Sequence, residues 1–369
     1  MDIANQDLKL VILKSASTLG GLIEKNIQKI RKDNAPLSLN ITESFFSSGE
    51  SKVSINESVR GKDLYIICDV GNFGLTYNMR GFINHCSPYD NYKQIKNVIG
   101  AISGQAKSIS IVMPLLIDSR QHRRNGREPL SCAITLQELG QMGIKNILTI
   151  DVHDPSVRQA LPLISFENIL VSNTLLKKFL INEKDKTNFD NLIVISPDQG
   201  AGPRTESIAN KLVCKMGTFS KIRDFSRVVN GKNPILAHNY MGPRLNGKDI
   251  LVVDDIISSG DSMLDIGLSA KKKGAKKVFY MATFSLFTEQ IERFREAYAK
   301  GQFNKVYTTN LTYINSEFVN EEWLEIIDCS YPLAQIINNL SLQKSISELL
   351  VDEELLVLRK SCPIHLTEE

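Results

Sequence analysis

The chain has 369 residues, which is enough for two or three domains of ordinary size. Its 44 Lys and Arg residues nearly balance its 41 Asp and Glu residues, so the net charge of +3 gives no general attraction to nucleic acid or to membranes. Hydrophobic residues make up 42% and charged residues 23%, which excludes a disordered or collagen-like chain and predicts a sizeable core.

The cysteines and the first residues predict a cytoplasmic protein. The six cysteines are scattered without a C-x-x-C pair, so we expect reduced thiols rather than a zinc site or disulfides. Asp7, Lys9 and Lys14 surround the first apolar run, which is therefore unlike a secretory signal. No uncharged apolar stretch reaches the roughly 18 residues that span a bilayer. We therefore expect a soluble protein that binds neither membrane nor nucleic acid.

Short apolar runs alternate with longer amphipathic segments along the chain, which predicts an α/β fold. Most of the runs are almost continuously apolar, as is typical of parallel strands with helices on both faces. The clearest strands are predicted at residues 63–69, 108–114, 146–152, 192–196, 250–253 and 277–283. Helices are predicted at residues 19–31, 130–142, 203–215 and 262–273.

One short segment occurs twice in similar form. Residues 143–148 (Gly-Ile-Lys-Asn-Ile-Leu) are similar to residues 274–279 (Gly-Ala-Lys-Lys-Val-Phe), and each follows a predicted helix. Two related α/β halves would explain the similarity, but so would the frequent use of glycine at the end of a helix. A domain boundary is predicted between residues 166 and 171, and the polar residues 182–191 are predicted to form a surface loop.

Residues 250–262 carry the clearest functional pattern, in which an apolar strand leads to Asp254 and Asp255 and then to a turn of small residues before a helix. Ligands bind at the carboxyl ends of parallel strands. The backbone N–H groups and hydroxyls of such a turn suit a phosphate, and the two acids suit sugar hydroxyls or a metal. The order of these features favours a phosphorylated-sugar site over a plain strand end with a helix cap. The residues of the proposed turn are Ser258, Ser259, Gly260, Asp261 and Ser262.

This segment resembles the ribose-phosphate loop of the phosphoribosyltransferase superfamily, and other segments indicate one branch of it. Residues 46–50 with 55–61, residues 119–124, residues 149–153 and residues 194–200 resemble motifs of the ribose-phosphate diphosphokinase (PRPP synthetase) family. These segments stand in the family's order and cover nearly the whole chain. A plain phosphoribosyltransferase would match only the loop near Asp254.

The resemblance implies a fold of two Rossmann-like phosphoribosyltransferase-type α/β domains with parallel sheets flanked by helices. Residues 1–168 would form the first domain, joined by a C-terminal helix within residues 332–369, and residues 169–331 would form the second. Members of the family assemble as hexamers built from dimers. The resemblance therefore also implies a homo-oligomer.

The activity implied by the resemblance is transfer of the diphosphoryl group of ATP to the anomeric hydroxyl of ribose 5-phosphate, which yields PRPP and AMP. His153 and Asp198 would hold Mg²⁺, whose ligands are hard oxygen and nitrogen atoms. Four arginines between Arg120 and Arg127 suit phosphate oxygens, although a solvated basic loop is the alternative interpretation. The ATP-binding residues would be Phe46, Ser48, Gly49, Glu50, Arg120 and Gln121.

The resemblance also assigns catalysis and the second substrate. Lys221 would stabilise the transition state from a loop that closes over the transferring group, and Arg223 would contact the migrating oxygens or the ribose phosphate. The full set expected to bind ribose 5-phosphate is Arg223, Asp254, Asp255, Ser258, Ser259, Gly260, Asp261 and Ser262.

Several positions depart from the family pattern and keep two alternatives open. Ser48 and His122 stand where the family has Asp, Ser258 replaces an Asp, and Asp261 replaces a Gly. The stretch between residues 69 and 92 is also longer than usual. A catalytically silent regulatory subunit is the first alternative, and a phosphoribosyltransferase is the second. An active enzyme is favoured because the chain keeps His153, Asp198, Lys221, Arg223, Asp254 and Asp255 together.

Overall fold

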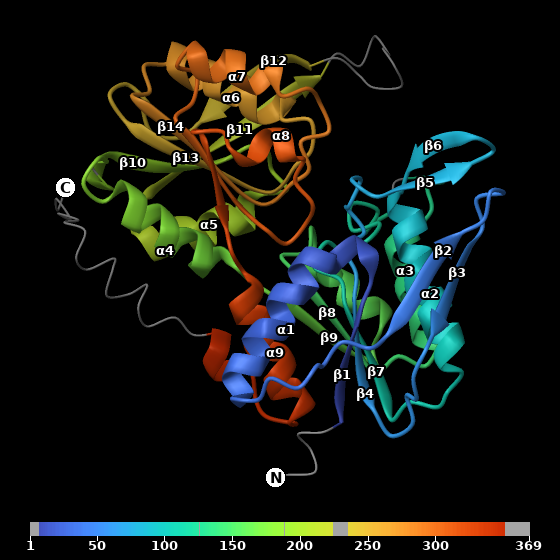
Figure 1. The fold of residues 1–369 in the computed structure, drawn as a ribbon. Coiled ribbons are helices and arrows are strands. Elements are labelled where there is room, and N and C mark those ends of the chain that lie inside the picture. The colour runs from blue at the N-terminus through green and yellow to red at the C-terminus, as the bar shows by residue number, and fades with distance from the viewer. Residues whose placement is uncertain (1–6, 125, 188, 224–234, 351–369) are drawn as a thin grey trace. The chain divides into compact units, whose positions relative to one another are not determined.

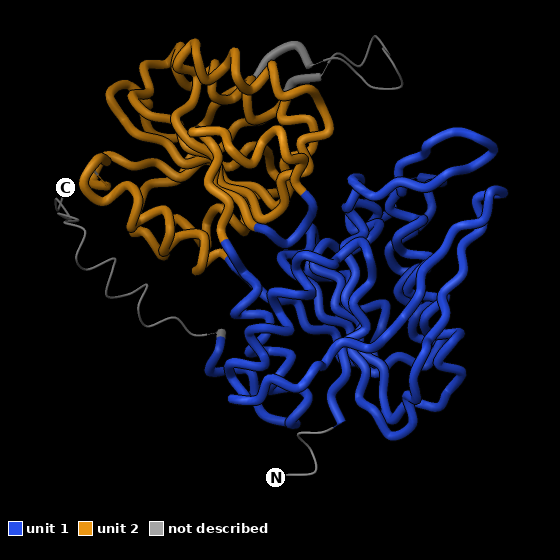
Figure 2. The backbone as a smooth tube through the Cα atoms, viewed as in Figure 1, with its two compact units in different colours: residues 1–171, 310–313, 328–351 blue, residues 172–309, 314–327, 352–369 orange. Residues whose placement is uncertain are grey.

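The computed structural model describes residues 7–124, 126–187, 189–223 and 235–350, which form two compact units. The first unit contains the chain up to Val171 together with Asn310–Tyr313 and the segment that starts at Asp328. The second unit contains the chain from Ser172 to Thr309 and Ile314–Ile327 (Figure 2). Both units are α/β, and both contain a mainly parallel sheet with helices packed on it, which confirms the predicted fold class (Figure 1).

The sheet of the first unit has five strands that are all parallel. In spatial order these are β1 (Leu8–Ile12), β4 (Asp63–Ile67), β7 (Ser108–Val112), β8 (Asn146–Ile150) and β9 (Ser165–Ile169). Two antiparallel hairpins stand apart from this sheet, namely β2 (Ile41–Phe45) with β3 (Ser51–Ile55) and β5 (Thr76–Met79) with β6 (Phe82–His85). The helical elements are η2 (Lys14–Ala16), α1 (Ser17–Arg31), α2 (Pro88–Ile102), α3 (Ser131–Gln141) and η3 (Pro155–Ala160).

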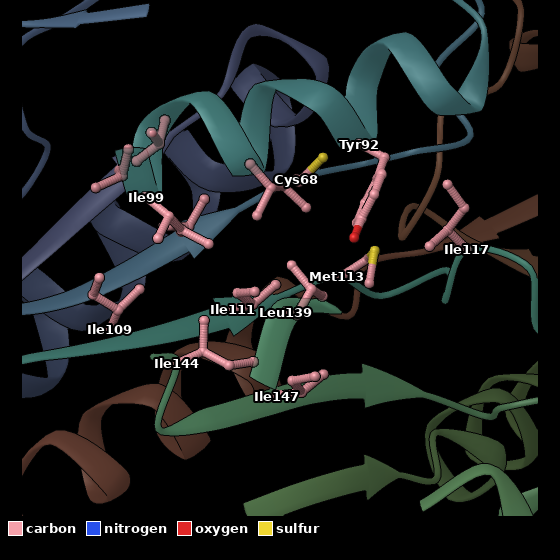
Figure 3. Packing of buried hydrophobic residues seen from close by; sticks show 14 of the residues in the cluster. Cys68, Tyr92, Ile99, Ile109, Ile111, Met113, Ile117, Leu139, Ile144 and Ile147 are labelled. Carbon is pink, nitrogen blue, oxygen red and sulfur yellow. The ribbon is translucent and has the colours of Figure 1, made fainter. Parts of the chain in front are cut away.

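The core of the first unit forms between the sheet and helices α2 and α3. Ile111 of β7 and Ile147 of β8 are fully buried and belong to one cluster with Ile99 of α2 and Leu139 of α3 (Figure 3). Each large aliphatic side chain buried in this way contributes roughly 1.5–3 kcal/mol. These strands are apolar because side chains on both faces of the sheet are covered.

Helix α9 (Ser330–Ser341) brings the end of the described chain back to the first unit, where it packs on α1. Asn26 donates a hydrogen bond to Ser330 Oγ over 3.0 Å. Arg31 donates from Nε to Asn338 Oδ1 over 2.8 Å and from a terminal nitrogen to Ser341 Oγ over 2.9 Å. The helix ends at Ser341, well before residue 369, and is followed by the 3-10 turn η5 (Ser347–Leu350).

The second unit contains a seven-stranded sheet in which only β12 runs antiparallel to its neighbour. In spatial order the strands are β12 (Ile235–Met241), β11 (Lys215–Arg223), β10 (Leu192–Ser196), β13 (Asp249–Ile257), β14 (Lys277–Ser285), β15 (Lys305–Thr309) and β16 (Leu324–Ile327). Helices α4 (Ser172–Glu183) and α5 (Gly202–Leu212) lie on one face, and α6 (Asp261–Lys272) and α7 (Glu292–Ala299) lie on the other (Figure 1). Two short elements, η4 (Phe189–Asn191) and α8 (Ser316–Val319), complete the unit.

All six strands and all four helices predicted from the pattern are present, with ends that differ by a few residues. The repeated segment marks equivalent junctions, because Gly143 leads from α3 into β8 and Gly274 leads from α6 into β14, both with positive φ. The predicted loop at residues 182–191 was partly wrong. It begins inside α4 and ends in η4, where Phe189 is buried.

Two further observations concern the described residues alone. None of the five cysteines among them forms a disulfide, and Cys362 lies outside this part of the chain. None of the helices that the structure describes is both long and apolar enough to cross a bilayer.

Asp69 follows β4 and anchors the returning segment of the chain. Its carboxylate accepts hydrogen bonds from Thr312 Oγ1 at 2.9 Å, from the Tyr313 N–H at 2.7 Å and from the Gly71 N–H at 2.9 Å. Burial raises the pKa of Asp69 to about 6, although these three donors oppose the shift. The folded chain therefore binds this proton more tightly than the unfolded chain does.

The raised pKa of Asp69 predicts a specific pH dependence of stability. Between about pH 4 and pH 6.5, rising pH ionises this carboxyl in a buried place, so its contribution to the free energy of unfolding falls by up to about 3 kcal/mol. Urea denaturation followed by circular dichroism across this range should show a steeper fall for the native chain than for Asp69→Asn. Identical pH profiles for the two proteins would contradict the assignment.

Candidate active site

Asp254 and Asp255 lie inside β13 and not after its end, because this strand continues to pair with β14 as far as Ile257. The predicted strand end at residue 253 was therefore too early. Alternation along the strand buries Asp255, which is 3% exposed, and leaves Asp254 half-buried. The two carboxyl groups nevertheless remain close enough to interact with each other.

The environment of these acids concentrates negative charge. Burial, the neighbouring Asp255 and then Asp198 raise the pKa of Asp254 well above its usual range. Asp254 Oδ1 accepts a hydrogen bond of 2.9 Å from the Asp255 N–H, and Asp255 Oδ1 lies 3.5 Å from a guanidinium nitrogen of Arg204 in α5. Sugar hydroxyls that donate hydrogen bonds, or a bound cation, would stabilise the negative charge of these carboxylates.

Asp198 reaches the same edge of the sheet from the neighbouring strand. It follows β10, which pairs in parallel with β13, so the carboxyl ends of both strands meet there. Asp198 Oδ1 accepts hydrogen bonds from the N–H groups of Gly200 at 2.9 Å and Ala201 at 3.2 Å, which fixes the entry into α5. The predicted metal ligand Asp198 and the predicted sugar ligands Asp254 and Asp255 are therefore brought together by the fold.

The donor chemistry here fits Mg²⁺, which commonly takes one or two carboxylates and completes its shell with water and substrate phosphates. Within the described residues no three His, Cys, Asp or Glu side chains form a group that could hold a metal ion.

The small-residue turn at residues 258–260 leads from β13 into α6. Its backbone is tied to the chain beyond β14, because the Thr288 N–H donates to the Ser258 carbonyl over 3.0 Å. Gly260 has a φ of +84°, and a Cβ at this position would lie 2.2 Å from Cζ of Phe294. Only glycine can therefore close this turn against the ring.

Asp261 is the first residue of α6, and its charge is already partnered. It accepts a hydrogen bond of 2.9 Å from Ser259 Oγ and forms an ion pair with Arg293 of α7. The acid also stands at the helix N-terminus, where negative charge is favourable. The negative charge of Asp261 beside the turn at residues 258–260 is thus compensated by Arg293 of α7. Ser258, Ser259 and Ser262 are half-buried around the same turn.

The predicted nucleotide turn forms the end of the β2–β3 hairpin in the first unit. The Phe46 N–H donates to the Glu50 carbonyl over 2.8 Å, and the Gly49 N–H donates to the Phe46 carbonyl over 2.9 Å. The Phe46 ring is 52% exposed, which leaves its face available for stacking. Ser48, which departs from the family pattern, donates to Glu50 Oε2 over 3.0 Å.

The arginine segment lies on an exposed loop between β7 and α3. Arg120 and Gln121 are exposed, and the Gln121 N–H donates to the Asp118 carbonyl over 2.8 Å. Arg123, Arg124 and Arg127 are also exposed. This exposure agrees with both interpretations of the segment, anion binding and a solvated loop.

The predicted metal ligand His153 follows β8 and is exposed. It lies beside His122, which is one of the residues that depart from the family pattern. The two imidazole rings lie 5.3 Å apart, and His122 Nε2 lies 3.3 Å from Asp154 Oδ2. Asp154 also accepts from the Ser156 N–H at 2.8 Å as the cap of η3. Hydrogen bonds from Ser156, and then the two histidines, lower the pKa of Asp154. Sequence reasoning missed Asp154, although it directly follows His153.

Lys221 and Arg223 are the last residues of β11, where the backbone of Lys221 pairs with that of His238 in β12. They are strand residues, so the expectation that they lie on a loop was wrong; residues 224–234 lie outside the described part of the chain. Sequence reasoning also missed Arg204 and Arg293. The first follows the Asp198 motif closely in sequence, but no local signal indicates the second.

Comparisons with known proteins match both units. A family model described as the N-terminal domain of ribose phosphate pyrophosphokinase matches residues 8–143, and a phosphoribosyl transferase domain model matches residues 169–307. The ribose-phosphate pyrophosphokinase of Neisseria meningitidis serogroup A is 26% identical over 319 residues, which cover 85% of this chain and 88% of that protein. The enzyme of the same name from Vibrio cholerae is 27% identical over 334 residues, which cover 89% and 96%.

A solved structure shares the fold. The phosphoribosylpyrophosphate synthetase of Mycobacterium smegmatis has a TM-score of 0.75 and 19% identity, and the match covers 92% of this chain and 100% of that chain. The family models cover most strands of both sheets, and the curated relatives span most of the sequence. This chain is therefore an enzyme of the ribose-phosphate pyrophosphokinase family.

Proposed function

We propose that the protein transfers the diphosphoryl group of ATP to the anomeric hydroxyl of ribose 5-phosphate and releases PRPP and AMP. The new bond joins the anomeric oxygen to the β-phosphorus, and the bond between the β-phosphorus and the oxygen bridging to the α-phosphate breaks. The observation that carries this proposal is the pair Asp254 and Asp255 in β13, which lead into the glycine turn before α6.

The turn after β13 would bind ribose 5-phosphate. Asp254 and Asp255 carry buried or half-buried carboxylates that accept hydrogen bonds, as ribose hydroxyls require. The 5-phosphate would take backbone N–H groups and hydroxyls at the start of α6, where the helix dipole also favours an anion. The residues assigned to this substrate are Arg223, Asp254, Asp255, Ser258, Ser259, Gly260, Asp261 and Ser262.

ATP would bind through the turn of the β2–β3 hairpin and the exposed arginine loop. Phe46 offers a half-exposed ring to adenine, while Arg120 and Gln121 offer donors to the phosphates. Because Ser48 donates to Glu50, the carboxylate of Glu50 remains in the turn as an acceptor even though the family's Asp is missing. Ser48, Gly49 and Glu50 therefore complete the proposed nucleotide site.

His153 and Asp198 would hold Mg²⁺, which when bound polarises the ATP phosphates and reduces their repulsion of the incoming oxygen. Lys221 and Arg223 would stabilise the charge that develops on the transferring group. These residues have the chemistry needed to align the reactants and neutralise a highly anionic centre, which is the main requirement of phosphoryl transfer.

We also propose that the protein acts in the cytoplasm as a homo-oligomer. The absence of disulfides among the described cysteines supports a reducing compartment. Exposed apolar side chains such as Phe82 and Ile83, each 74% exposed, support an assembly that covers them. Analytical ultracentrifugation should show a dimer or a dimer-based hexamer, and a monomer at micromolar concentration would contradict this part of the proposal.

A direct assay tests the reaction. The purified chain is mixed with ATP, Mg²⁺ and ribose 5-phosphate, and the products are followed by phosphorus NMR and nucleotide chromatography. AMP and PRPP should form in equal amounts. Formation of ADP would contradict attack at the β-phosphorus, and retained ATP binding without turnover would support a catalytically silent regulatory subunit. Turnover of PRPP with a nucleobase instead would support a phosphoribosyltransferase.

A further inference from the structure

The β5–β6 hairpin, which lies within the stretch between residues 69 and 92 that the resemblance marks as longer than usual, packs directly on the predicted nucleotide turn. The Arg80 N–H donates a hydrogen bond of 2.9 Å to the Ser47 carbonyl inside that turn. The ring of Tyr77 stacks on that of Phe45 with centroids 4.2 Å apart and planes 14° apart. The hairpin therefore contacts both the end of β2 and the turn that follows it.

Met79 packs closely against the turn at Gly49. A Cβ placed on Gly49 would lie 2.6 Å from Met79 Sδ, so the thioether lies directly over the backbone of the turn. Gly49 has a φ of +94°, which other residues rarely adopt. The turn thus combines an unusual backbone conformation with a side chain that packs closely against it.

The β5–β6 hairpin is itself held firmly at both ends. Its strands join through Arg80 and Gly81, which have φ angles of 53° and 84°, as a tight two-residue hairpin turn requires. At its base the Cys86 N–H donates to the Leu75 carbonyl over 2.8 Å, and the rings of Phe73 and His85 stack 4.2 Å apart. The hairpin can therefore act as a rigid support.

Contacts with helix α2 hold the strands of the β2–β3 hairpin, because Val53 is buried and Asn97 donates hydrogen bonds to Ser51. The turn at residues 46–50 is largely exposed, so the contacts from the β5–β6 hairpin add order where α2 does not cover it. A binding loop that is ordered before the ligand arrives avoids the entropy cost of ordering on binding. Support of the turn by the β5–β6 hairpin would thus lower the KM for ATP and leave kcat unchanged.

We propose that the β5–β6 hairpin is a positioning element for the nucleotide, in which Met79 and Tyr77 hold the turn at residues 46–50 in its binding conformation. The inference rests on the proposed function, because it assumes that this turn binds ATP. Met79 and Tyr77 are positioning residues that act through the turn.

The test replaces Met79 by alanine. The KM for ATP should rise about five- to tenfold, while kcat at saturating ATP and the KM for ribose 5-phosphate stay unchanged. Met79→Leu, which restores most of the packing volume, should recover the native KM for ATP. Asn78→Ala on the same strand is the matched control, because the Asn78 side chain is exposed, and it should leave all three constants unchanged.

Calorimetric binding of a non-hydrolysable ATP analogue separates this inference from the proposed function. If the native chain binds the analogue and Met79→Ala binds it about five- to tenfold more weakly, the positioning role stands even without turnover. An unchanged affinity in Met79→Ala would overturn the positioning role while leaving the proposed function intact. A fall in kcat with an unchanged KM for ATP would also overturn it. If the native chain binds no analogue, both the inference and the proposed nucleotide site fail.

Discussion

Replacing Gly260 by alanine is expected to destabilise the second unit and to raise the KM for ribose 5-phosphate more than tenfold. A left-handed conformation costs an alanine about 1–2 kcal/mol. The new Cβ would also lie 2.2 Å from Phe294 Cζ, and overpacking of this kind typically costs about 1–3 kcal/mol. Phe294 cannot move away easily, because it is fully buried and its ring stacks on that of Trp323 with centroids 5.4 Å apart. The backbone of the turn at residues 258–260 must therefore shift.

Gly301→Ala is the matched control for this prediction. Gly301 lies in the same unit with a φ of +65°, but a Cβ there would meet nothing within 4 Å. It should show only the backbone cost of about 1–2 kcal/mol and a native KM for ribose 5-phosphate. Thermal unfolding by circular dichroism and steady-state kinetics measure the two effects. Equal behaviour of the two variants would show that the Phe294 contact does not position the turn.

Replacing Lys221 by alanine is expected to lower kcat by about a hundred- to a thousandfold while changing the affinity for ATP by less than about twofold. The reason is that, in the role proposed for Lys221, its ammonium group gains most of its interaction as charge develops on the transferring group in the transition state. Loss of the charge therefore affects turnover far more than ground-state binding.

Lys215→Ala provides the control for Lys221→Ala, because Lys215 is an exposed lysine at the start of the same strand. It removes the same charge and should leave kcat unchanged. Lys221→Arg keeps a cation with a different shape and should recover only part of the rate. Parallel losses of turnover and of ATP analogue binding in Lys221→Ala would refute the transition-state role.

Local pattern indicated one part of the candidate site, in which an apolar strand leads to Asp254, Asp255 and the turn before α6. His153 and Asp198 were assigned because their segments resemble family motifs, although both residues do follow apolar strands. Parallel strands place such residues at one edge of a sheet without further information. Asp198, Asp254 and Asp255 are brought together in this way by the pairing of β10 with β13.

Helix α2 and the β5–β6 hairpin were not predicted. Helix α2 has a capping box between Ser87 and Asp90 and a proline at its first position, signals that could have predicted it. The β5–β6 hairpin had no comparable alternation, because its residues are largely exposed. Its contact with the nucleotide turn depends on packing between segments that are about thirty residues apart.

By itself, the sequence determined the α/β class, the order of the strands along the chain and the chemical identity of the site residues. These properties follow from short-range periodicity and from motifs of a few residues. Only the tertiary structure decided that β13 continues past its two acids, because β14 supplies the hydrogen bonds. It also decided that Arg293 compensates Asp261 and that Met79 packs on the turn at Gly49. Each of these contacts joins residues distant in sequence, and such pairings arise only when the whole chain has folded.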